Sequence, residues 1–340
     1  MRITIQWLAI LALAGGATAQ KAASGLPQSG EVILKPKIKR QQKLMLPAEP
    51  ATAVATGFHF EDGIGADFRA NIDGAALLID TDGDGKLETR VEGDTGFVVL
   101  TSNGLRYGVS LSAKPEWNFR SGSFVSGMIG DTLIRIIDQN HNGRFDDVGQ
   151  DAMVVGKGRA AGFLSEVISV DGELRKIQVA ADGSKLRFSP FVGEVGKLSL
   201  HAVTDGKVMA AVLNSQDGRY SVHLSKQDAE VMVPAGDYLL HSGVLSMAGS
   251  RVTMQAGRSK PITVASSGTQ ALSWGGPAKA EFSYEEKGDE LVFDPTKIWF
   301  YGATNEEYRD WNPVGKSPLI VVTDNATGKV VVETRFPGSC

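Results

Sequence analysis

Short apolar runs, separated by turn-forming residues, dominate the sequence from Gly57 onward. The runs are rich in β-branched residues and are bounded by Gly, Asp, Asn and Ser, a pattern typical of β-strands. Representative runs are residues 75–79, 96–101, 133–137, 207–213, 319–323 and 329–334. No window has a sustained helical period, and the 40 glycines fit many tight turns. The sequence therefore predicts an all-β chain of more than one domain.

Two of these runs are each followed by an acidic loop with the same spacing of side chains. The loops begin at Asp80 and Asp138, 58 positions apart, and share the pattern Asp-x-[Asp/Asn]-x-[Asp/Asn]-Gly-x-x-[Asp/Glu]. Oxygen ligands at positions 1, 3, 5 and 9 suit a hard cation such as Ca²⁺, and position 7 can add its carbonyl. Glycine at position 6, Gly85 or Gly143, permits the sharp turn that directs these oxygens inward.

The two loops predict two Ca²⁺ sites. The candidate ligands are Asp80, Asp82, Asp84, Lys86 and Glu88 in the first loop and Asp138, Asn140, Asn142, Arg144 and Asp146 in the second. We expect Lys86 and Arg144 to offer only a backbone carbonyl and to direct their charges away. Carboxylates crowded into a short loop repel one another unless a cation lies among them. The alternative is a metal-free surface turn, since Asp and Gly are both common in turns.

The loops resemble the Asp-rich calcium loops of dockerins, thrombospondin type 3 repeats and other secreted bacterial EF-hand-like modules. They depart from an EF-hand at position 12, where a bidentate Glu is replaced by Val91 in one loop and Gly149 in the other. Candidates to supply a ligand from a shifted position are Glu92 or Asp94 and Asp147 or Asp151. The resemblance implies weak calcium binding with a structural role, without the opening motion of a calcium sensor.

Each loop lies between two apolar runs, so the chain contains an internal repeat of strand, acidic loop and strand. Residues 72–79 precede the first loop and residues 129–137 precede the second; residues 94–99 align with residues 151–155 downstream. A hairpin whose long connection is organised by a metal explains both copies. We expect residues 72–99 and 129–155 to superpose within one β domain that spans residues 57–190.

The first residues have the organisation of a secretory signal peptide. Met1-Arg2 precedes a short apolar run and the small residues Ala17-Thr18-Ala19, which predicts residues 1–19 as a signal peptide and a secreted or periplasmic mature chain. The alternative is an uncleaved anchor, but the run is shorter than the ~20 residues of a spanning helix. We expect no membrane span after cleavage. Cys340 is the only cysteine, so calcium would take the place of a disulfide staple.

The remaining boundaries follow from composition. Residues 20–56 are basic and interrupted by prolines, which predicts a linker. This linker either is solvated or tethers the protein to an anionic surface. Residues 191–270 predict a β-sandwich, and residues 233–238 (Val-Pro-Ala-Gly-Asp-Tyr) resemble a turn of transthyretin-like and carboxypeptidase-regulatory-like sandwiches. Residues 271–340 predict either another sandwich or the second half of the same one, and end in a hairpin pattern.

Several functional classes are disfavoured by the sequence. The formal net charge of −4 and the lack of a basic stripe argue against nucleic acid as a partner. We find no nucleophile elbow, close zinc pair or phosphate-binding loop, and therefore assign no catalytic residue. A group of aromatic residues forms either core or a sugar-stacking platform: Trp274, Trp299, Tyr301, Tyr308 and Trp311.

We therefore expect a secreted, calcium-binding, non-catalytic β protein with a binding or scaffolding role at the cell surface or outside the cell. The alternatives are a carbohydrate-binding module or accessory domain of polysaccharide processing, and a hydrolase with dispersed catalytic residues. A polysaccharide or a cell-surface protein is the partner that these alternatives suggest. The sequence leaves the partner and the oligomeric state open.

Overall fold

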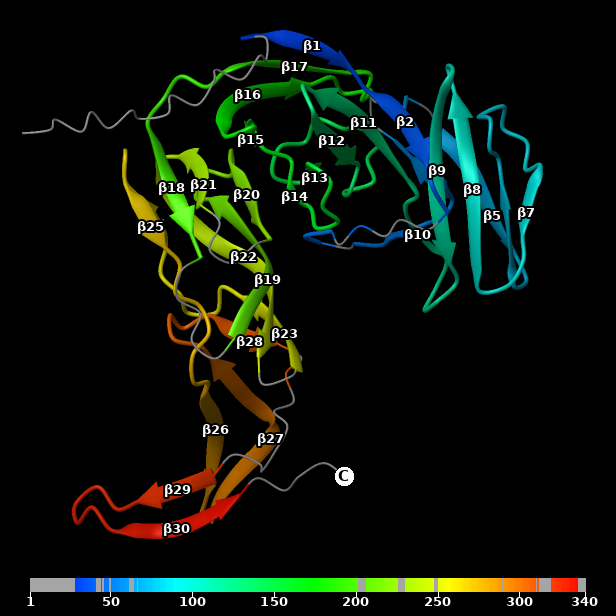
Figure 1. The fold of residues 1–340 in the computed structure, drawn as a ribbon. Helices are drawn as coiled ribbons and strands as arrows, with labels where there is room; N and C mark the ends of the chain where they lie inside the picture. Colours follow the sequence, from blue (N-terminus) through cyan, green and yellow to red (C-terminus); the bar gives the residue numbers. More distant parts are fainter. Residues whose placement is uncertain are drawn as a thin grey trace, which may run out of the picture.

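The computed structural model describes residues 28–40, 44, 46–48, 50–60, 64–65, 67–200, 206–225, 230–247, 250–288, 290–309, 311 and 319–335. Within these residues every regular element is a β-strand (Figure 1). The buried apolar side chains form two large hydrophobic cores and a small third cluster that includes Phe124 and Val154. The predicted all-β, multi-domain fold is confirmed. The described residues contain no helix long and apolar enough to cross a membrane. The predicted signal peptide lies outside the described residues.

The first core is enclosed by four small sheets. One sheet contains, in spatial order, β4 (Gly57–His59), β5 (Asp67–Asp73), β6 (Ala76–Ile79) and β7 (Thr89–Val91), and a second contains β3 (Thr52–Ala53), β10 (Asn118–Ser121), β9 (Leu105–Ser112) and β8 (Thr95–Ser102). The third sheet contains β14 (Gly162–Phe163), β13 (Ala152–Val155), β12 (Thr132–Ile137), β11 (Ser123–Ile129) and β2 (Lys35–Ile38). The fourth contains β1 (Gly30–Ile33), β17 (Lys185–Pro190), β16 (Glu173–Val179) and β15 (Val167–Val170). Inward-facing residues such as Phe58, Leu77 and Ile136 are fully buried. Alternation along short strands explains this burial, because successive side chains point to opposite faces.

The second core is sandwich-like. A small sheet contains β21 (Glu230–Pro234), β18 (Val195–Ser199) and β25 (Thr269–Ala271). The larger sheet contains β20 (Ser221–Leu224), β19 (Gly206–Ser215), β22 (Gly236–Met247), β23 (Ser250–Gln255), β28 (Glu307–Arg309), β27 (Glu290–Tyr301) and β26 (Lys279–Lys287), and β24 (Ile262–Val264) pairs with β22. Strands from both sides of residue 270 therefore share one sheet, which favours a single sandwich over two. The hairpin of β29 (Leu319–Thr323) and β30 (Val330–Arg335) forms a separate sheet.

Part of the segment predicted as a linker belongs to the first core. β1 pairs antiparallel with β17, and β2 pairs antiparallel with β11. Leu34, between the two strands, is only 4% exposed. The linker prediction is therefore wrong for residues 30–38. The prediction treated proline as a sign of irregular structure. β2 is an edge strand, however, where Pro36 is tolerated because the missing N–H costs least.

The acidic loops connect antiparallel hairpin strands, as the repeat predicted. The first loop joins β6 to β7 with Ile79 opposite Thr89, and the second joins β12 to β13 with Ile137 opposite Ala152. The downstream alignment differs from our expectation, because β7, and not the segment at residues 94–99, corresponds to β13. The first loop closes after residue 88 and the second after residue 151, so the second contains five additional residues.

Candidate metal centre

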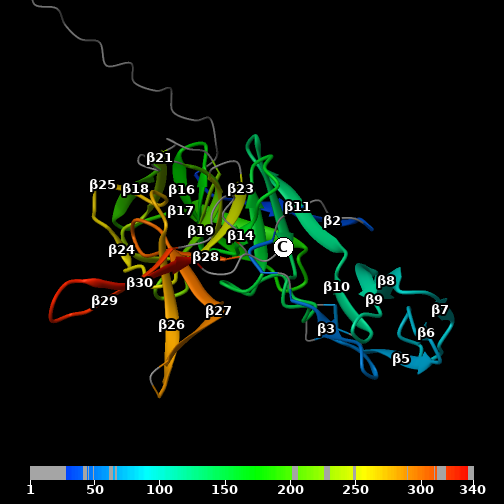
Figure 2. The same cartoon turned by 90° about the horizontal axis from the view of Figure 1, so that it is seen from below.

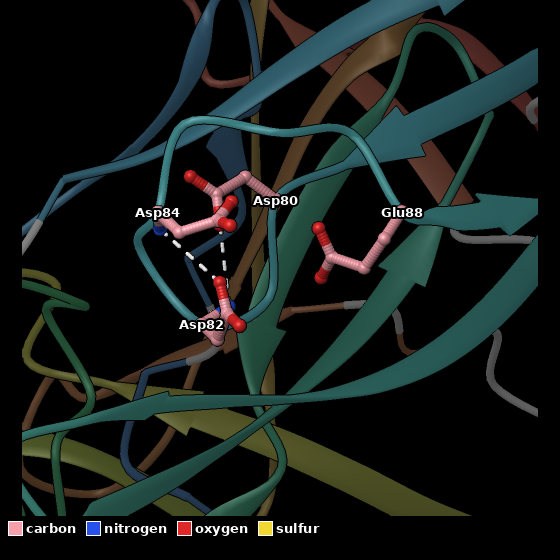
Figure 3. Close-up of side chains that lie close together, drawn as sticks. All are labelled: Asp80, Asp82, Asp84 and Glu88. Atoms are coloured by element: carbon pink, nitrogen blue, oxygen red, sulfur yellow. Dashed lines mark hydrogen bonds between the residues drawn. The ribbon is translucent and has the colours of Figure 1, made fainter.

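The first loop brings its four acidic side chains together. Asp80 follows the buried end of β6 and is itself 1% exposed, whereas Asp82, Asp84 and Glu88 are exposed. One carboxylate oxygen from each of the four lies within 4.8 Å of the others (Figure 3). Four converging carboxylates form an oxygen-rich donor set that could hold a metal ion.

Backbone hydrogen bonds fix this arrangement. The Asp80 carboxylate accepts the N–H groups of Asp82, Gly83 and Gly85 at 3.2, 2.7 and 2.8 Å. One oxygen of Asp82 accepts the N–H of Asp84 at 3.1 Å, and one oxygen of Asp84 accepts the N–H of Lys86 at 2.8 Å. Gly85 has φ +87°, the left-handed conformation that glycine adopts without steric cost. Backbone N–H groups thus hold both oxygens of Asp80 and one oxygen each of Asp82 and Asp84.

Local donors also reach the acidic group. Lys86 Nζ lies 2.6 Å from Asp84 Oδ2. Its charge therefore points toward the acidic side chains, whereas we expected it to point away from them. This hydrogen bond from Lys86 holds the pKa of the exposed Asp84 carboxyl below its usual range. Burial raises the pKa of Glu88, but hydrogen bonds from the hydroxyl and N–H of Thr81 lower it, and the net shift is downward. Asp84 and Glu88 are therefore ionised at neutral pH and attract cations.

The second loop repeats the backbone pattern position by position. Asp138 accepts the N–H groups of His141 and Gly143, each at 2.7 Å. Asn140 accepts the N–H of Asn142 at 3.3 Å, and Asn142 accepts that of Arg144 at 2.9 Å. These bonds are the counterparts of those made by Asp80, Asp82 and Asp84 in the first loop. The duplication predicted from spacing therefore extends to the hydrogen bonding of the loops.

The potential ligand atoms of the second loop are used differently. The amide nitrogens of Asn140 and Asn142 donate to one oxygen of Asp147, at 3.0 and 2.7 Å. Asp146 is held by Arg144 in a bidentate ion pair at 3.0 Å, so Arg144 also keeps its charge within the loop. Among the described residues, only the first loop gathers three or more acidic or histidine side chains at ligand distances.

The two loops also differ in how deeply their acidic side chains are buried. Asp138 is fully buried and accepts the hydroxyl of buried Tyr107 at 2.8 Å, and burial raises its pKa to about 6. Fully buried Asp151 accepts the N–H groups of Gln139 and Asp147 at 3.2 and 3.1 Å. Burial, together with the nearby charge of Asp138, raises the pKa of Asp151 to about 9. Both carboxyl groups therefore brace the polypeptide inside the first core.

The second loop also contacts distant parts of the chain. Thr52 Oγ1 lies 3.0 Å from Nδ1 of His141, and the N–H of Ala48 donates to Gln139 at 3.3 Å. On the other side, the N–H of Leu164 donates to the carbonyl of Asp151 at 2.7 Å. The segment that contains Leu164 leads to Glu166, which pairs with Arg219 of the second core at 2.7 Å. Hydrogen bonds therefore connect the second loop to the segments that contain Ala48, Thr52 and Leu164.

None of the shifted acids joins the ligand group of the first loop. Val91, at position 12, is buried in the core. Glu92 pairs with Arg90 at 3.0 Å, and the exposed Asp94 pairs with Lys114 at 2.5 Å. Asp94 therefore does not match the buried Asp151, contrary to our expectation.

Sequence reasoning missed three contacts of the loops. Thr81 donates to Glu88, Tyr107 donates to Asp138, and Asp147 accepts two side-chain amides. Thr81 lies at position 2 of the first loop, where a hydroxyl next to an acidic position 9 was the available signal. Tyr107 comes from β9, 31 positions before Asp138, and no local spacing pattern connects the two.

The aromatic residues of the last third lie mostly in the second core. Trp274, Tyr301 and Tyr308 are 2%, 5% and 3% exposed. Trp311 packs edge-on against Tyr308, with ring centroids 5.7 Å apart. Trp299 is 36% exposed and is the exception. The core interpretation accounts for these residues better than a sugar-stacking platform.

Comparison of the chain with protein-family models, curated proteins and solved structures finds no match. The geometry of the loops is therefore the main guide to function.

Proposed function

We propose that this chain is a secreted, calcium-binding, non-catalytic β protein with a binding or scaffolding role at the cell surface or outside the cell. The convergence of Asp80, Asp82, Asp84 and Glu88 is the observation that carries the proposal. All four are hard oxygen donors, and Ca²⁺ takes six to eight oxygens from carboxylates, carbonyls and water. Backbone bonds already hold the three Asp side chains in place, which lowers the entropic cost of binding.

The calcium-dependent role belongs to the first loop in this proposal. An ion in the second loop would have to displace Asp147 from the amides of Asn140 and Asn142, and Arg144 from Asp146. In the first loop the competing contacts are those of Lys86, 81% exposed, with Asp84 and of Thr81 with Glu88. We therefore expect tighter calcium binding at the first loop than at the second.

The scaffolding role is supported by how the other candidate groups are used. The buried carboxyls of Asp138 and Asp151 accept backbone N–H groups, which argues against their use in hydrolysis. The packed aromatic residues argue against a carbohydrate-binding platform. Secretion rests on the signal-peptide pattern of residues 1–19.

Replacement of both Asp82 and Asp84 by Ala should abolish calcium binding by the first loop. The parent should bind with a dissociation constant of about 10⁻⁴–10⁻³ M, the range of extracellular modules. Isothermal titration calorimetry on the mature chain measures both. The matched control replaces Asn140 and Asn142 by Ala and should leave this binding unchanged. Parental affinity in the Asp82→Ala, Asp84→Ala variant would contradict the assignment.

Calcium should stabilise the first core and leave the second nearly unaffected. An ion that binds only the folded state contributes about 2.7 kcal/mol at a concentration 100 times its dissociation constant. Thermal unfolding with millimolar calcium or with chelator gives the total change, and hydrogen exchange of peptides from residues 67–112 and 206–255 locates it. A melting temperature insensitive to both additions would refute this stabilising role.

A further inference from the structure

A cavity of about 200 Å³ lies where strands of the first core meet strands of the second. At this interface β14 contacts β19 and β20, and β15 and β16 contact β21 (Figure 1, Figure 2). Ligand sites occur preferentially at interfaces between domains. The side chains that line the cavity are mostly apolar and come from both sides of it, among them Met153, Phe163, Ile168, Val222, Val231 and Met232.

Hydrogen bonds across the interface fix the walls of the cavity. Ser221 Oγ accepts the N–H of Phe163 at 3.0 Å, and Ser165 Oγ accepts the N–H of Ser221 at 3.2 Å. Arg219 pairs with Glu166 at 2.7 Å, and the N–H of Glu166 donates to the carbonyl of Arg219 at 3.0 Å. The cavity is therefore part of the folded arrangement, as ligand pockets usually are.

One polar atom at the cavity lacks a partner. His223 lines the cavity, and its Nε2 is buried without a hydrogen-bond partner within the described residues. Burial lowers the pKa of His223 to about 4, so the ring is neutral at physiological pH. A buried polar atom without a partner lowers stability. A ligand that forms a hydrogen bond to this nitrogen removes that cost.

The lining of the cavity selects an uncharged ligand. Among the described residues that line it, none has an acidic or a lysine or arginine side chain, and an unpaired charge is costly to bury. An apolar cavity of about 150 Å³ binds benzene, so a single ring fits this one. A neutral imidazole nitrogen donates in one tautomer and accepts in the other. A hydroxyl group fits both tautomers, because it can accept and donate.

We propose that this cavity is a binding site for a small, uncharged molecule with one apolar ring and one hydroxyl group, which forms a hydrogen bond to His223 Nε2. His223 also lines a second cavity, of about 210 Å³, beside Pro47, Ala161 and Val212. The first cavity is the more enclosed of the two, and a ligand site buries most of the surface of its ligand. No residue of either acidic loop lines the first cavity, so the binding does not depend on calcium.

Methyl NMR of the mature chain with isotope-labelled methionine tests the proposal, with phenol as the probe. Met153 and Met232 line the cavity, whereas Met128 and Met209 are exposed elsewhere. Phenol should shift the signals of Met153 and Met232 with a millimolar dissociation constant, because so small a molecule makes few contacts. The signals of Met128 and Met209 should stay unchanged, and chelator should alter neither result.

Toluene is the matched probe, because a methyl group replaces the hydroxyl. His223→Phe should raise the dissociation constant of phenol roughly fivefold, the equivalent of one neutral hydrogen bond, and should leave that of toluene unchanged. Val155→Trp, at the 37% exposed rim of the cavity, should fill the space and abolish the binding of both probes. Val192→Trp makes the same change at a 93% exposed position outside the cavity and should have no effect.

Four results would overturn the site. Met153 and Met232 signals that do not shift at any soluble concentration of phenol, or phenol binding that survives Val155→Trp, would show that the cavity is not the site. Unchanged phenol binding in His223→Phe, or equal weakening of phenol and toluene, would show that His223 does not bind the hydroxyl. Circular dichroism checks the fold of each variant, and retained toluene binding in His223→Phe shows that the cavity itself is intact.

Discussion

Asp138→Ala should destabilise the first core by about 4 kcal/mol, because each buried donor left without its partner costs roughly 1–3 kcal/mol. The variant orphans the Tyr107 hydroxyl and the N–H groups of His141 and Gly143, all in buried residues. Denaturant unfolding monitored by circular dichroism measures the loss, and hydrogen exchange assigns it to the first core.

Asp80→Ala is the matched control at the same position of the first loop. Asp80 also accepts three backbone N–H groups, but these belong to the exposed residues Asp82, Gly83 and Gly85. Water can satisfy exposed donors, so we expect a loss of about 1 kcal/mol in calcium-free solution. Equal losses in the two variants would show that burial of the second loop is not what makes its aspartate necessary.

The fold class follows from local features of the sequence. In β6 the alternate residues Leu77 and Ile79 are fully buried, as expected for a strand with one face on a core. The first Asp of each loop comes directly after its strand, and Gly85 and Gly143 both take a left-handed conformation. Spacing and residue type alone were therefore enough to predict the strand before each loop and the shared conformation of the two loops.

The closure of each hairpin could not be predicted in the same way. Spacing aligns Asp94 with Asp151, but β7 begins at Thr89 and β13 at Ala152. The five additional residues of the second loop place Asp147 against two amides and Asp151 beneath the backbone. Such contacts depend on which residues the fold buries together. Burial therefore gives the second loop a network of internal hydrogen bonds, whereas the first loop remains an exposed, acidic cluster.

The same contrast should appear when the glycine at position 6 is changed. Gly143→Ala should lower the free energy of unfolding by about 3 kcal/mol. About 1 kcal/mol of this loss comes from a left-handed conformation at a non-glycine residue, and the remainder comes from overpacking a filled site. Gly143 has φ +83°, and an added Cβ would lie 2.7 Å from Ile64 Cγ2 and 2.8 Å from Phe60 Cβ. Denaturant unfolding of the calcium-free protein measures the effect.

Gly85→Ala separates the two contributions to that loss. Gly85 has nearly the same backbone angle, φ +87°, but the nearest atom to an added Cβ is the flexible Arg69 side chain at 3.9 Å. Only the backbone cost remains, so the expected loss is about 1 kcal/mol. The excess in Gly143→Ala then measures how tightly Phe60 and Ile64 pack on the second loop. Equal losses at the two glycines would mean that this loop can shift away from the core, and would remove the packing difference on which the contrast between the loops depends.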